Sequence, residues 1–298
     1  MLDLEELIED NRGLGTTPLR QAQLVMLRLL RITDAICKRH GLRYWLCSGT
    51  LLGAVRHGGF IPWDDDIDIG MPREDYERFV QIAERELPDS VVMQLRDQET
   101  YLRFNVNPCK IKDRNSRIVE PGESKLNPEK GLFLDVFPFD AFSRKGSLRF
   151  YYERMVKHFY IVMGKFKDSM AYRDLSMTRS LLSKFHRLWL IMFRLSLGWT
   201  LVEVKRSRKY CEQRPFVGFG FDVPFKACYP DEVVYPLKDI EFEGYRFMCP
   251  NNIHVFLTTS FGPNYMTPPP VCKRKVHALE IVPDLRDGAA VFQQKTIS

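Results

Sequence analysis

The sequence lacks the patterns that mark disulfide-bonded, zinc-binding and membrane-spanning proteins. Its seven cysteines are widely scattered and form no CxxC pair. This argues against a disulfide framework and a zinc knuckle, and favours reduced thiols in a cytosol. No uninterrupted apolar run reaches the ~20 residues of a transmembrane helix, and the acidic segment 1–10 has no apolar core of the kind found in secretory signals. We therefore expect a cytoplasmic protein.

The composition is that of an ordinary globular protein with a modest excess of basic residues. Of the 298 residues, 45% are hydrophobic and 28% are charged, and the net charge is +6. Such a charge favours anionic partners without choosing among nucleotide, nucleic acid and lipid headgroup. The chain has no internal repeat, no low-complexity segment and no evident RNA-binding module, so we do not expect nucleic acid as a partner.

The most informative segment runs from Trp63 to Ile69 and reads Trp-Asp-Asp-Asp-Ile-Asp-Ile. On a β-strand the side chains of residues i and i+2 share a face, so Asp66 and Asp68 point one way while the isoleucines point into a core. Two carboxylates this close repel each other and lose hydration on burial unless a cation lies between them. Mg²⁺ prefers oxygen ligands and fits best, with Mn²⁺ as an alternative. The segment therefore predicts a metal-dependent reaction at phosphorus.

Two further segments are expected to complete this site. Ser48-Gly49-Thr50 ends a strand and opens a short helix, whose backbone N–H groups can hold a phosphate. Asp135 lies within the apolar run 131–137, at a position where an apolar residue is expected. Three carboxylates from two strands can bind one or two Mg²⁺ ions, and Asp135 is also placed to act as a base toward an acceptor hydroxyl. The alternative is an acidic surface loop with Asp135 in a structural ion pair.

Several basic side chains are candidates for phosphate binding. Arg56 and His57 leave the short helix toward the acidic segment, and Arg56 can clamp a phosphate through two hydrogen bonds. His57 is a candidate either for proton transfer or for a hydrogen bond within the loop. Lys110 and Lys112 share one face of a predicted strand, where they either reach phosphate or line a solvated sheet edge.

The pattern of apolar residues predicts helices and strands around a long basic insertion. Residues 18–40 form the clearest helix, with Thr17 as N-cap, Pro18 in the first turn and Gly41 at the end. From about residue 143 to 215, lysine and arginine outnumber acids and the periodicity is helical. We therefore divide the chain into a catalytic core (1–142), a basic helical insertion (143–215) and a C-terminal segment (216–298) that completes the catalytic domain. Strands are expected at 42–47, 91–95, 101–106, 109–119, 131–137, 233–237, 240–242 and 245–249, and further helices at 51–56 and around 76–87.

The insertion has a composition that suggests a membrane partner. Residues 148–210 interleave Phe, Tyr, Trp and Leu with Lys and Arg, which is typical of interfacial membrane binding. The same pattern fits a solvated helical cap with an apolar inner face. We keep peripheral contact with the inner face of a membrane as a prediction.

The segment 48–69 reads Ser-Gly-Thr-Leu-Leu-Gly-Ala-Val-Arg-His-Gly-Gly-Phe-Ile-Pro-Trp-Asp-Asp-Asp-Ile-Asp-Ile. It closely resembles the LicD family, which includes bacterial phosphocholine transferases and is related to fukutin. Segments 236–244 and 261–269 resemble the C-terminal blocks of that family, and the likeness is weak in the basic insertion. The resemblance implies an α/β (α+β) fold of the nucleotidyltransferase type, with a mixed β-sheet flanked by helices.

The resemblance also implies a reaction: transfer of a phospho-alcohol from a CDP-activated donor to a hydroxyl of a cell-surface glycan, with release of CMP. The glycan could belong to lipopolysaccharide, teichoic acid or capsule, and a lipid-linked acceptor would lie at the bilayer surface. On this basis Ser48, Gly49 and Thr50 hold donor phosphate, the three aspartates named above bind Mg²⁺, and Asp65 belongs to the substrate-binding acidic run. CDP-choline is the favoured donor, while ethanolamine, glycerol and ribitol head groups stay open.

Two other functions also stay open. The same fold and carboxylates serve nucleotidyltransferases that move NMP from an NTP to a small molecule or RNA, so the fold alone does not discriminate. The third possibility is a non-enzymatic basic protein that docks on a membrane or on nucleic acid. Release of CMP from a CDP-alcohol, as opposed to pyrophosphate from an NTP, separates the first two.

Overall fold

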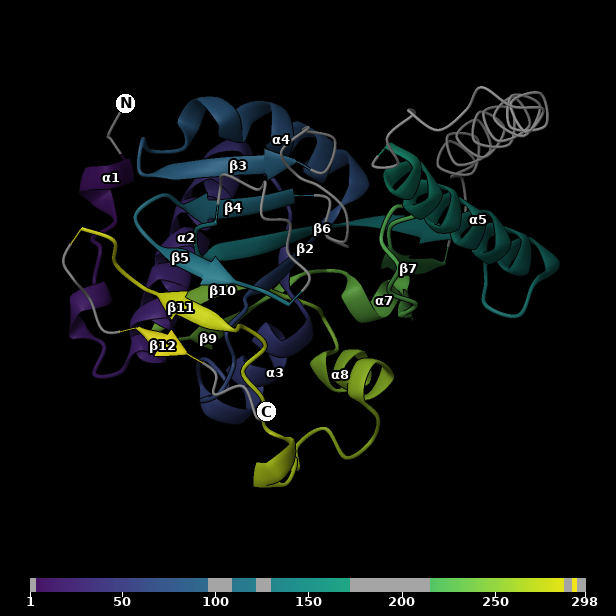
Figure 1. Ribbon diagram of the computed structural model, residues 1–298. Coiled ribbons are helices and arrows are strands. Elements are labelled where there is room, and N and C mark those ends of the chain that lie inside the picture. Colours follow the sequence, from purple (N-terminus) through teal and green to yellow (C-terminus); the bar gives the residue numbers. More distant parts are fainter. Residues whose placement is uncertain (1–3, 96–108, 122–129, 172–214, 287–290, 294–298) are drawn as a thin grey trace, which may run out of the picture. The chain divides into compact units, whose positions relative to one another are not determined.

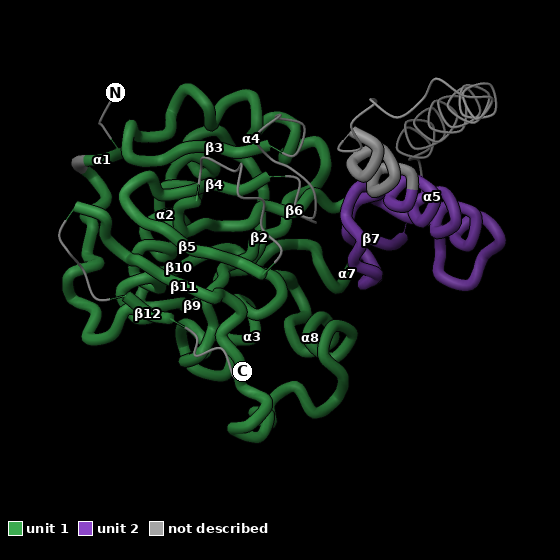
Figure 2. Tube along the Cα trace, in the orientation of Figure 1, with its two compact units in different colours: residues 1–139, 232–298 green, residues 140–231 purple. Residues whose placement is uncertain are grey.

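The computed structural model describes residues 4–95, 109–121, 130–171, 215–286 and 291–293. The chain divides into two compact units, one formed by residues 1–139 and 232–298 and the other by residues 140–231 (Figure 2). The sequence pattern places the insertion at 143–215, whereas the smaller unit begins at 140 and ends at 231. Residues 172–214 of that insertion, and the strand predicted at 101–106, lie outside the described residues.

The larger unit is a mixed α/β domain whose elements are labelled in Figure 1. Its helices are α1 (Leu4–Leu7), η1 (Arg12–Leu14), α2 (Pro18–His40), α3 (Ser48–His57), α4 (Arg73–Glu86), α7 (Asp231–Val234, which starts at the unit boundary), α8 (Ile253–Phe261) and η3 (Val271–Lys273). Its strands are β1 (Trp45–Leu46), β2 (Asp68–Pro72), β3 (Val91–Leu95), β4 (Cys109–Asp113), β5 (Arg117–Val119), β6 (Phe133–Phe142, which runs past the boundary), β9 (Lys238–Phe242), β10 (Tyr245–Cys249), β11 (Glu280–Val282) and β12 (Phe292–Gln293).

The central sheet of this unit has the strand order β1-β2-β6-β4-β3. The pair β2–β6 is parallel, whereas β1–β2, β6–β4 and β4–β3 are antiparallel. Every residue of β2 and of β4 is buried, as expected for inner strands that have neighbours on both sides. The mixed sheet flanked by helices confirms the predicted fold class.

Helix α2 confirms the clearest prediction from the sequence. The Thr17 hydroxyl accepts a 3.1 Å hydrogen bond from the amide of Arg20, Pro18 stands at the first position, and Gly41 ends the helix with a left-handed φ of +61°. The helix packs against β4, β11 and α4. Its apolar stripe is fully buried, and each such side chain stabilises the fold by about 1.5–3 kcal/mol. The stripe consists of Val25, Leu29, Ile32 and Ile36.

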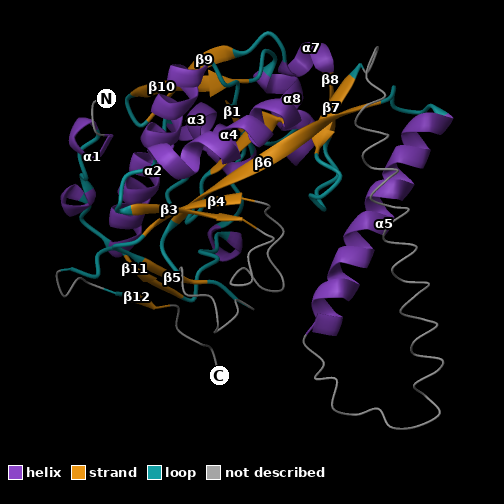
Figure 3. Cartoon of the chain, turned by 90° about the horizontal axis from the view of Figure 1, so that it is seen from above, coloured by secondary structure: helices purple, strands orange, loops and turns teal. Residues whose placement is uncertain are grey.

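Helices α3 and α4 precede and follow the acidic segment and β2 in the chain. Helix α3 follows β1 directly and packs against β2, while α4 follows β2 and packs against β2 and β3. In Figure 3, α2, α3 and α4 gather beside the central sheet. Because α3 and β2 are in contact, the Ser-Gly start of the helix and the start of β2 are close in space.

Two small sheets complete the larger unit. Strands β9 and β10 form an antiparallel hairpin whose turn residues, Glu243 and Gly244, both have left-handed φ values of +53° and +79°. That conformation is typical of a tight hairpin turn, although a glutamate is unusual in it. The other sheet has the order β12-β11-β5 and joins the C-terminal segment to the strand that follows β4.

Four predicted elements differ from the structure. The strand expected at 233–237 is wrong: residues 231–234 form helix α7, and a cis peptide bond follows at Tyr235–Pro236. The strand expected at 109–119 is two strands, because the polar residues 114–116 form a turn between β4 and β5. The strand expected at 42–47 is confined to two residues, and the helix expected at 51–56 begins three residues earlier, at Ser48.

The smaller unit contains the last residues of β6 together with α5 (Leu148–Ala171), β7 (Phe216–Phe219) and β8 (Cys228–Pro230). Lys157 on α5 is buried and its ammonium donates to the carbonyl oxygens of Phe219 and Phe225 at 2.6 and 2.8 Å, which ties the helix to the loop after β7. None of the helices in the described ranges has the length and hydrophobicity of a membrane span. The core of this unit consists of Phe142, Phe150, Val156, Phe221 and Cys228.

Candidate active site

Strands β2 and β6 place two aspartates beside each other. Asp68, the first residue of β2, is the register partner of Asp135 on the parallel strand β6. Residues paired across neighbouring strands project to the same face of a sheet, so the two carboxylates lie on one side. Both residues are buried, with 8% and 4% of their surface exposed. The structure thus brings together two of the three carboxylates predicted to bind metal, and the third, Asp66, precedes Asp68 by two positions.

The start of helix α3 lies next to these carboxylates. Ser48 has a left-handed φ of +48°, and its hydroxyl forms a hydrogen bond with Asp68 that lowers the pKa of that carboxyl. A Cβ atom on Gly49 would lie 2.8 Å from Oδ2 of Asp64, so a larger residue would collide with the acidic segment. Thr50 faces the interior, where its Oγ1 accepts a 2.7 Å hydrogen bond from the amide of Asp68. Thr50 therefore fixes the start of β2 relative to α3.

The acidic cluster, defined as Asp64, Asp66, Asp68 and Asp135, cannot carry four full negative charges. Loss of hydration on burial, together with repulsion between the carboxylates, raises the pKa of Asp64 to about 8, and burial raises that of Asp135 to about 7. The same causes raise the pKa values of Asp66 and Asp68. Asp64 and Asp66 are joined by a hydrogen bond, so one of the two carboxyls carries the proton between them.

This chemistry fits a hard divalent cation. A cation among the carboxylates replaces the protons that otherwise reduce their repulsion, and it provides the charge that burial of the cluster requires. Carboxylate oxygens from two adjacent strands and from the loop before β2 are the kind of ligand that Mg²⁺ prefers. Asp66, Asp68 and Asp135 are the residues that would hold it.

Lys110 and Lys112 lie on the inner strand β4, so the interpretation as a solvated sheet edge is wrong. β4 lies between β6 and β3, and both lysines are almost fully buried. The Nζ atom of Lys110 lies 3.4 Å from a carboxylate oxygen of Asp135, 3.4 Å from one of Glu120 and 3.0 Å from the ring centre of Phe133. Asp135 therefore does take part in an ion pair, as one alternative proposed, but it does so within the acidic cluster.

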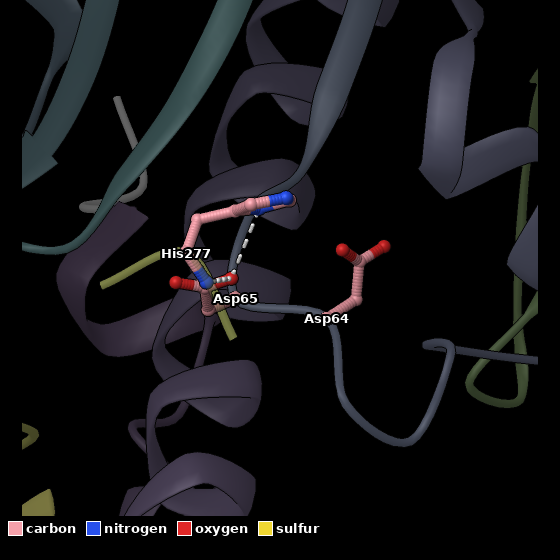
Figure 4. Close-up of side chains that lie close together, drawn as sticks. All are labelled: Asp64, Asp65 and His277. Carbon is pink, nitrogen blue, oxygen red and sulfur yellow. Dashed lines mark hydrogen bonds and ion pairs between the residues drawn. The ribbon is translucent and has the colours of Figure 1, made fainter. Parts of the chain in front are cut away.

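Asp65 lies beside the acidic cluster and holds the C-terminal segment. Its two oxygens accept hydrogen bonds from the backbone amides of His277 and Ala278 at 2.9 and 2.6 Å, and the His277 ring lies 3.4 Å away. Figure 4 shows Asp65 turned toward His277 while the neighbouring Asp64 points elsewhere. A carboxylate oxygen of Asp64, one of Asp65 and a ring nitrogen of His277 all lie within 4.8 Å of one another. These contacts raise the pKa of His277 to about 9, mainly through the hydrogen bond with Asp65.

Arg56 and His57 lie in the last turn of α3, close to Trp63 and Arg274. Arg56 donates to the carbonyl oxygen of Tyr265 at 3.2 Å and to the His57 ring at 3.1 Å. The guanidinium of Arg274 lies over the Trp63 ring at 4.4 Å. Burial and the positive charge of Arg274 lower the pKa of Arg56, and burial together with both arginines lowers that of His57.

Sequence reasoning placed Asp64 in the acidic run without giving it a role, and it did not identify Glu120, Arg274 and His277 as parts of this region. Asp64 had a signal, since it begins the acidic run and the structure directs it toward Gly49. The other three carried no local signal. Glu120 reaches Asp135 through their shared partner Lys110, and Arg274 and His277 approach the acidic segment from more than 200 residues further along the chain.

A mixed sheet with carboxylates on adjacent strands, next to a Ser-Gly helix start, fits a nucleotidyltransferase-like domain. Residues 41–176 match the model of the LicD/FKTN/FKRP nucleotidyltransferase domain. Over these residues the chain is similar to the LicD family.

Named relatives agree with this assignment. The lipopolysaccharide cholinephosphotransferase LicD of Haemophilus influenzae is 29% identical over 266 residues, which cover 88% of this chain and 96% of the relative. The human ribitol 5-phosphate transferase FKRP is 51% identical over 53 residues, or 16% of this chain and 11% of the relative. The murine ribitol-5-phosphate transferase FKTN is 32% identical over 83 residues, or 28% of this chain and 17% of the relative.

Proposed function

We propose that this chain transfers a phospho-alcohol from a CDP-activated donor to a hydroxyl of a cell-surface glycan, with phosphocholine as the first candidate group. The observation that carries the proposal is the similarity to a lipopolysaccharide cholinephosphotransferase over most of both chains. The shorter likeness to two ribitol 5-phosphate transferases supports the reaction class and makes ribitol the second candidate head group.

The reaction exchanges one phosphoester bond for another. The bond from the phosphorus of the phospho-alcohol to the oxygen that bridges to CMP breaks, and its electron pair stays on CMP. The same phosphorus forms a bond to the glycan oxygen, whose proton passes to a base or to solvent. Mg²⁺ held by Asp66, Asp68 and Asp135 would neutralise the pyrophosphate and the charge on the leaving oxygen.

Protein groups around the cluster have complementary roles. The backbone amides at Ser48 and Gly49 start a helix, where the positive end of the helix dipole favours a phosphate. Lys110 is a buried cation against Asp135 and holds that carboxylate in place on β6. Thr50 keeps Asp68 in register through the Asp68 amide, so we now propose that Thr50 positions the site.

The test is a screen for CMP release. Purified protein is incubated with Mg²⁺, a panel of CDP-alcohols (choline, ethanolamine, glycerol, ribitol) and saccharide acceptors, and CMP is quantified. We expect CMP to form with one donor, to require the acceptor, and to stop when EDTA is added. Absence of CMP above background with every donor and acceptor would contradict the proposal, and pyrophosphate release from NTPs without turnover of any CDP-alcohol would favour an NMP-transferring enzyme.

We further propose that α5 makes peripheral contact with an anionic membrane surface, where a lipid-linked acceptor would be found. One side of the helix presents an exposed apolar stripe, at a spacing that keeps its members on one face. The helix also carries several lysines and arginines, which is the composition of an interfacial helix. The stripe consists of Leu148, Tyr151, Met155 and Phe159.

Sedimentation with vesicles that contain phosphatidylglycerol tests this contact. The double variant Tyr151→Asp/Phe159→Asp should lose binding, whereas the control Leu285→Asp, at an exposed apolar residue of the larger unit, should bind like the wild type. Equal binding of the stripe variant and the wild type would remove α5 from the contact.

A further inference from the structure

Two arginines from distant parts of the chain lie together beside the acidic cluster without a carboxylate partner. Arg56 comes from the end of α3 and Arg274 directly follows η3. Within the described ranges neither guanidinium forms an ion pair. Arg56 donates to the carbonyl oxygen of Tyr265 and to the His57 ring, and Arg274 donates to the carbonyl oxygen of Pro269 and lies over the Trp63 ring. Like charges held side by side cost free energy unless an anion lies between them.

Both guanidiniums are held by the same loop. Arg56 donates to the carbonyl oxygen of Tyr265 at 3.2 Å, and Arg274 donates through Nε to that of Pro269 at 3.0 Å. Arg274 also stacks on Trp63, the residue that precedes the acidic run. Each arginine therefore keeps a fixed orientation while part of its fork of N–H groups is left for another acceptor.

Charge interactions and hydrogen bonds place this pair next to the metal-binding residues. The two arginines are close enough for the charge of Arg274 to act on Arg56, and Asp64 acts on Arg56 with the opposite sign. The carboxylate of Asp65 holds the amides of His277 and Ala278, only three and four residues beyond Arg274. Asp65 is thus a positioning residue that anchors the segment carrying Arg274.

We propose that Arg56 and Arg274 form a clamp for the pyrophosphate group of the nucleotide-activated donor. A pyrophosphate that contacts Mg²⁺ in the acidic cluster needs cations for its remaining oxygens, and guanidinium forks match phosphate oxygens through paired hydrogen bonds. The inference rests on the proposed function, which supplies a donor with a pyrophosphate. It adds Arg274 to the donor site and gives Trp63 a specific role as the stacking partner that orients Arg274.

The test measures binding directly, with CDP and inorganic pyrophosphate as probes, by isothermal titration calorimetry in the presence of Mg²⁺. Arg274→Gln should weaken binding of both probes about 10- to 100-fold, the range expected when a charge-assisted contact is lost. Arg274→Lys keeps the charge but not the forked guanidinium. Its dissociation constants should lie between those of the wild type and those of Arg274→Gln. The control Lys275→Gln removes the same charge from an exposed neighbouring residue and should change the dissociation constants less than about 2-fold.

Further outcomes decide between explanations. If Arg274→Gln binds CDP and pyrophosphate like the wild type, or weakens them no more than Lys275→Gln does, the clamp is refuted. If Arg274→Gln instead raises only the KM for the glycan acceptor, the anion belongs to the acceptor and the clamp on the donor is refuted as well. If pyrophosphate binding depends on Arg274 while no CDP-alcohol is turned over, the clamp stands and the proposed donor is wrong.

Discussion

Asp68 and Asp135 pair directly across the parallel strands β2 and β6. The register of the backbone, fixed by hydrogen bonds on both sides of β6, therefore sets the separation of their carboxylates. A site carried by inner strands is held more rigidly than one carried by loops. Because both carboxylates are held on inner strands, their repulsion must be offset by bound protons, by Lys110 or by a metal ion. The first two predictions follow from this requirement.

Replacing Asp68 by Asn should abolish most activity without unfolding the protein. We expect kcat for CMP release to fall at least ~10³-fold if the carboxylate contributes several kcal/mol through a metal ion. The thermal midpoint of the metal-free variant at pH 8 should equal or exceed that of the wild type, because one of several repelling carboxylates has been removed. Asp89→Asn, at an exposed position, is the control, and near-normal turnover by Asp68→Asn would remove Asp68 from the site.

The metal-free protein should lose stability as the pH rises. Asp64 and Asp135 have folded-state pKa values of about 8 and about 7, above the ~3.9 of an unfolded aspartate. The folded state therefore holds more protons than the unfolded state between about pH 4 and 8, and stability falls across that window. Thermal midpoints measured in EDTA should decrease from pH 6 to 8.5.

Added Mg²⁺ should reverse this loss. The thermal midpoint should increase more at pH 8.5 than at pH 6, because at the higher pH the metal displaces fewer protons from the carboxylates. In EDTA, the thermal midpoint of Asp64→Asn should decrease less between pH 6 and 8.5 than that of the wild type. A midpoint that rises with pH in the metal-free wild type would show that the acidic cluster is not protonated as described.

Gly49→Ala should impair activity more than stability. The added methyl would lie 2.8 Å from a carboxylate oxygen of Asp64, so either the acidic segment or the start of α3 must shift. A displacement of this size within a catalytic site commonly costs on the order of 10²-fold in rate. The control is Gly13→Ala, where nothing lies within 4 Å of the new methyl; equal turnover by the two variants would contradict the prediction.

Glu243→Gln should destabilise the larger unit. The Glu243 carboxylate accepts hydrogen bonds from Arg20 at 3.0 and 2.6 Å and from the amide of Phe60 at 3.0 Å, and thereby ties the β9–β10 turn to α2 and to the loop before the acidic segment. Loss of these charge-assisted contacts should lower the free energy of unfolding by about 1–2 kcal/mol in urea titrations. The surface pair Arg117–Glu280 provides the control, since Glu280→Gln should cost well under ~1 kcal/mol.

Elements whose signals are local could be predicted from the sequence. Helix α2 begins at Pro18 and ends at His40 as predicted, because its cap, its apolar stripe and its terminal glycine are all encoded within the segment. The segment 233–237 has the apolar character of a strand, yet the acidic pair at its start and Pro236 at its end fit a short helix and a turn, and the structure forms these instead.

The candidate site was predictable only in part. Alternation in the acidic run places Asp66 and Asp68 on one face, and the embedded charge at Asp135 is visible in its strand. The partner of Asp135 on β4 and the arginine that meets Arg56 could not be predicted, because no spacing rule connects residues that pair across 25 to more than 200 positions of chain.

The hydrogen bonds from the amides of His277 and Ala278 to Asp65 have a consequence for synthesis. A nascent chain can begin to form the parallel strands soon after residue 142 has left the ribosome, since domains fold as their segments emerge. The loop with Asp65 nevertheless waits for a segment made some 200 residues later. Under our proposal, a chain that is still being translated lacks Arg274 and the segment that Asp65 holds. It would therefore bind the donor weakly and would not turn it over before release from the ribosome.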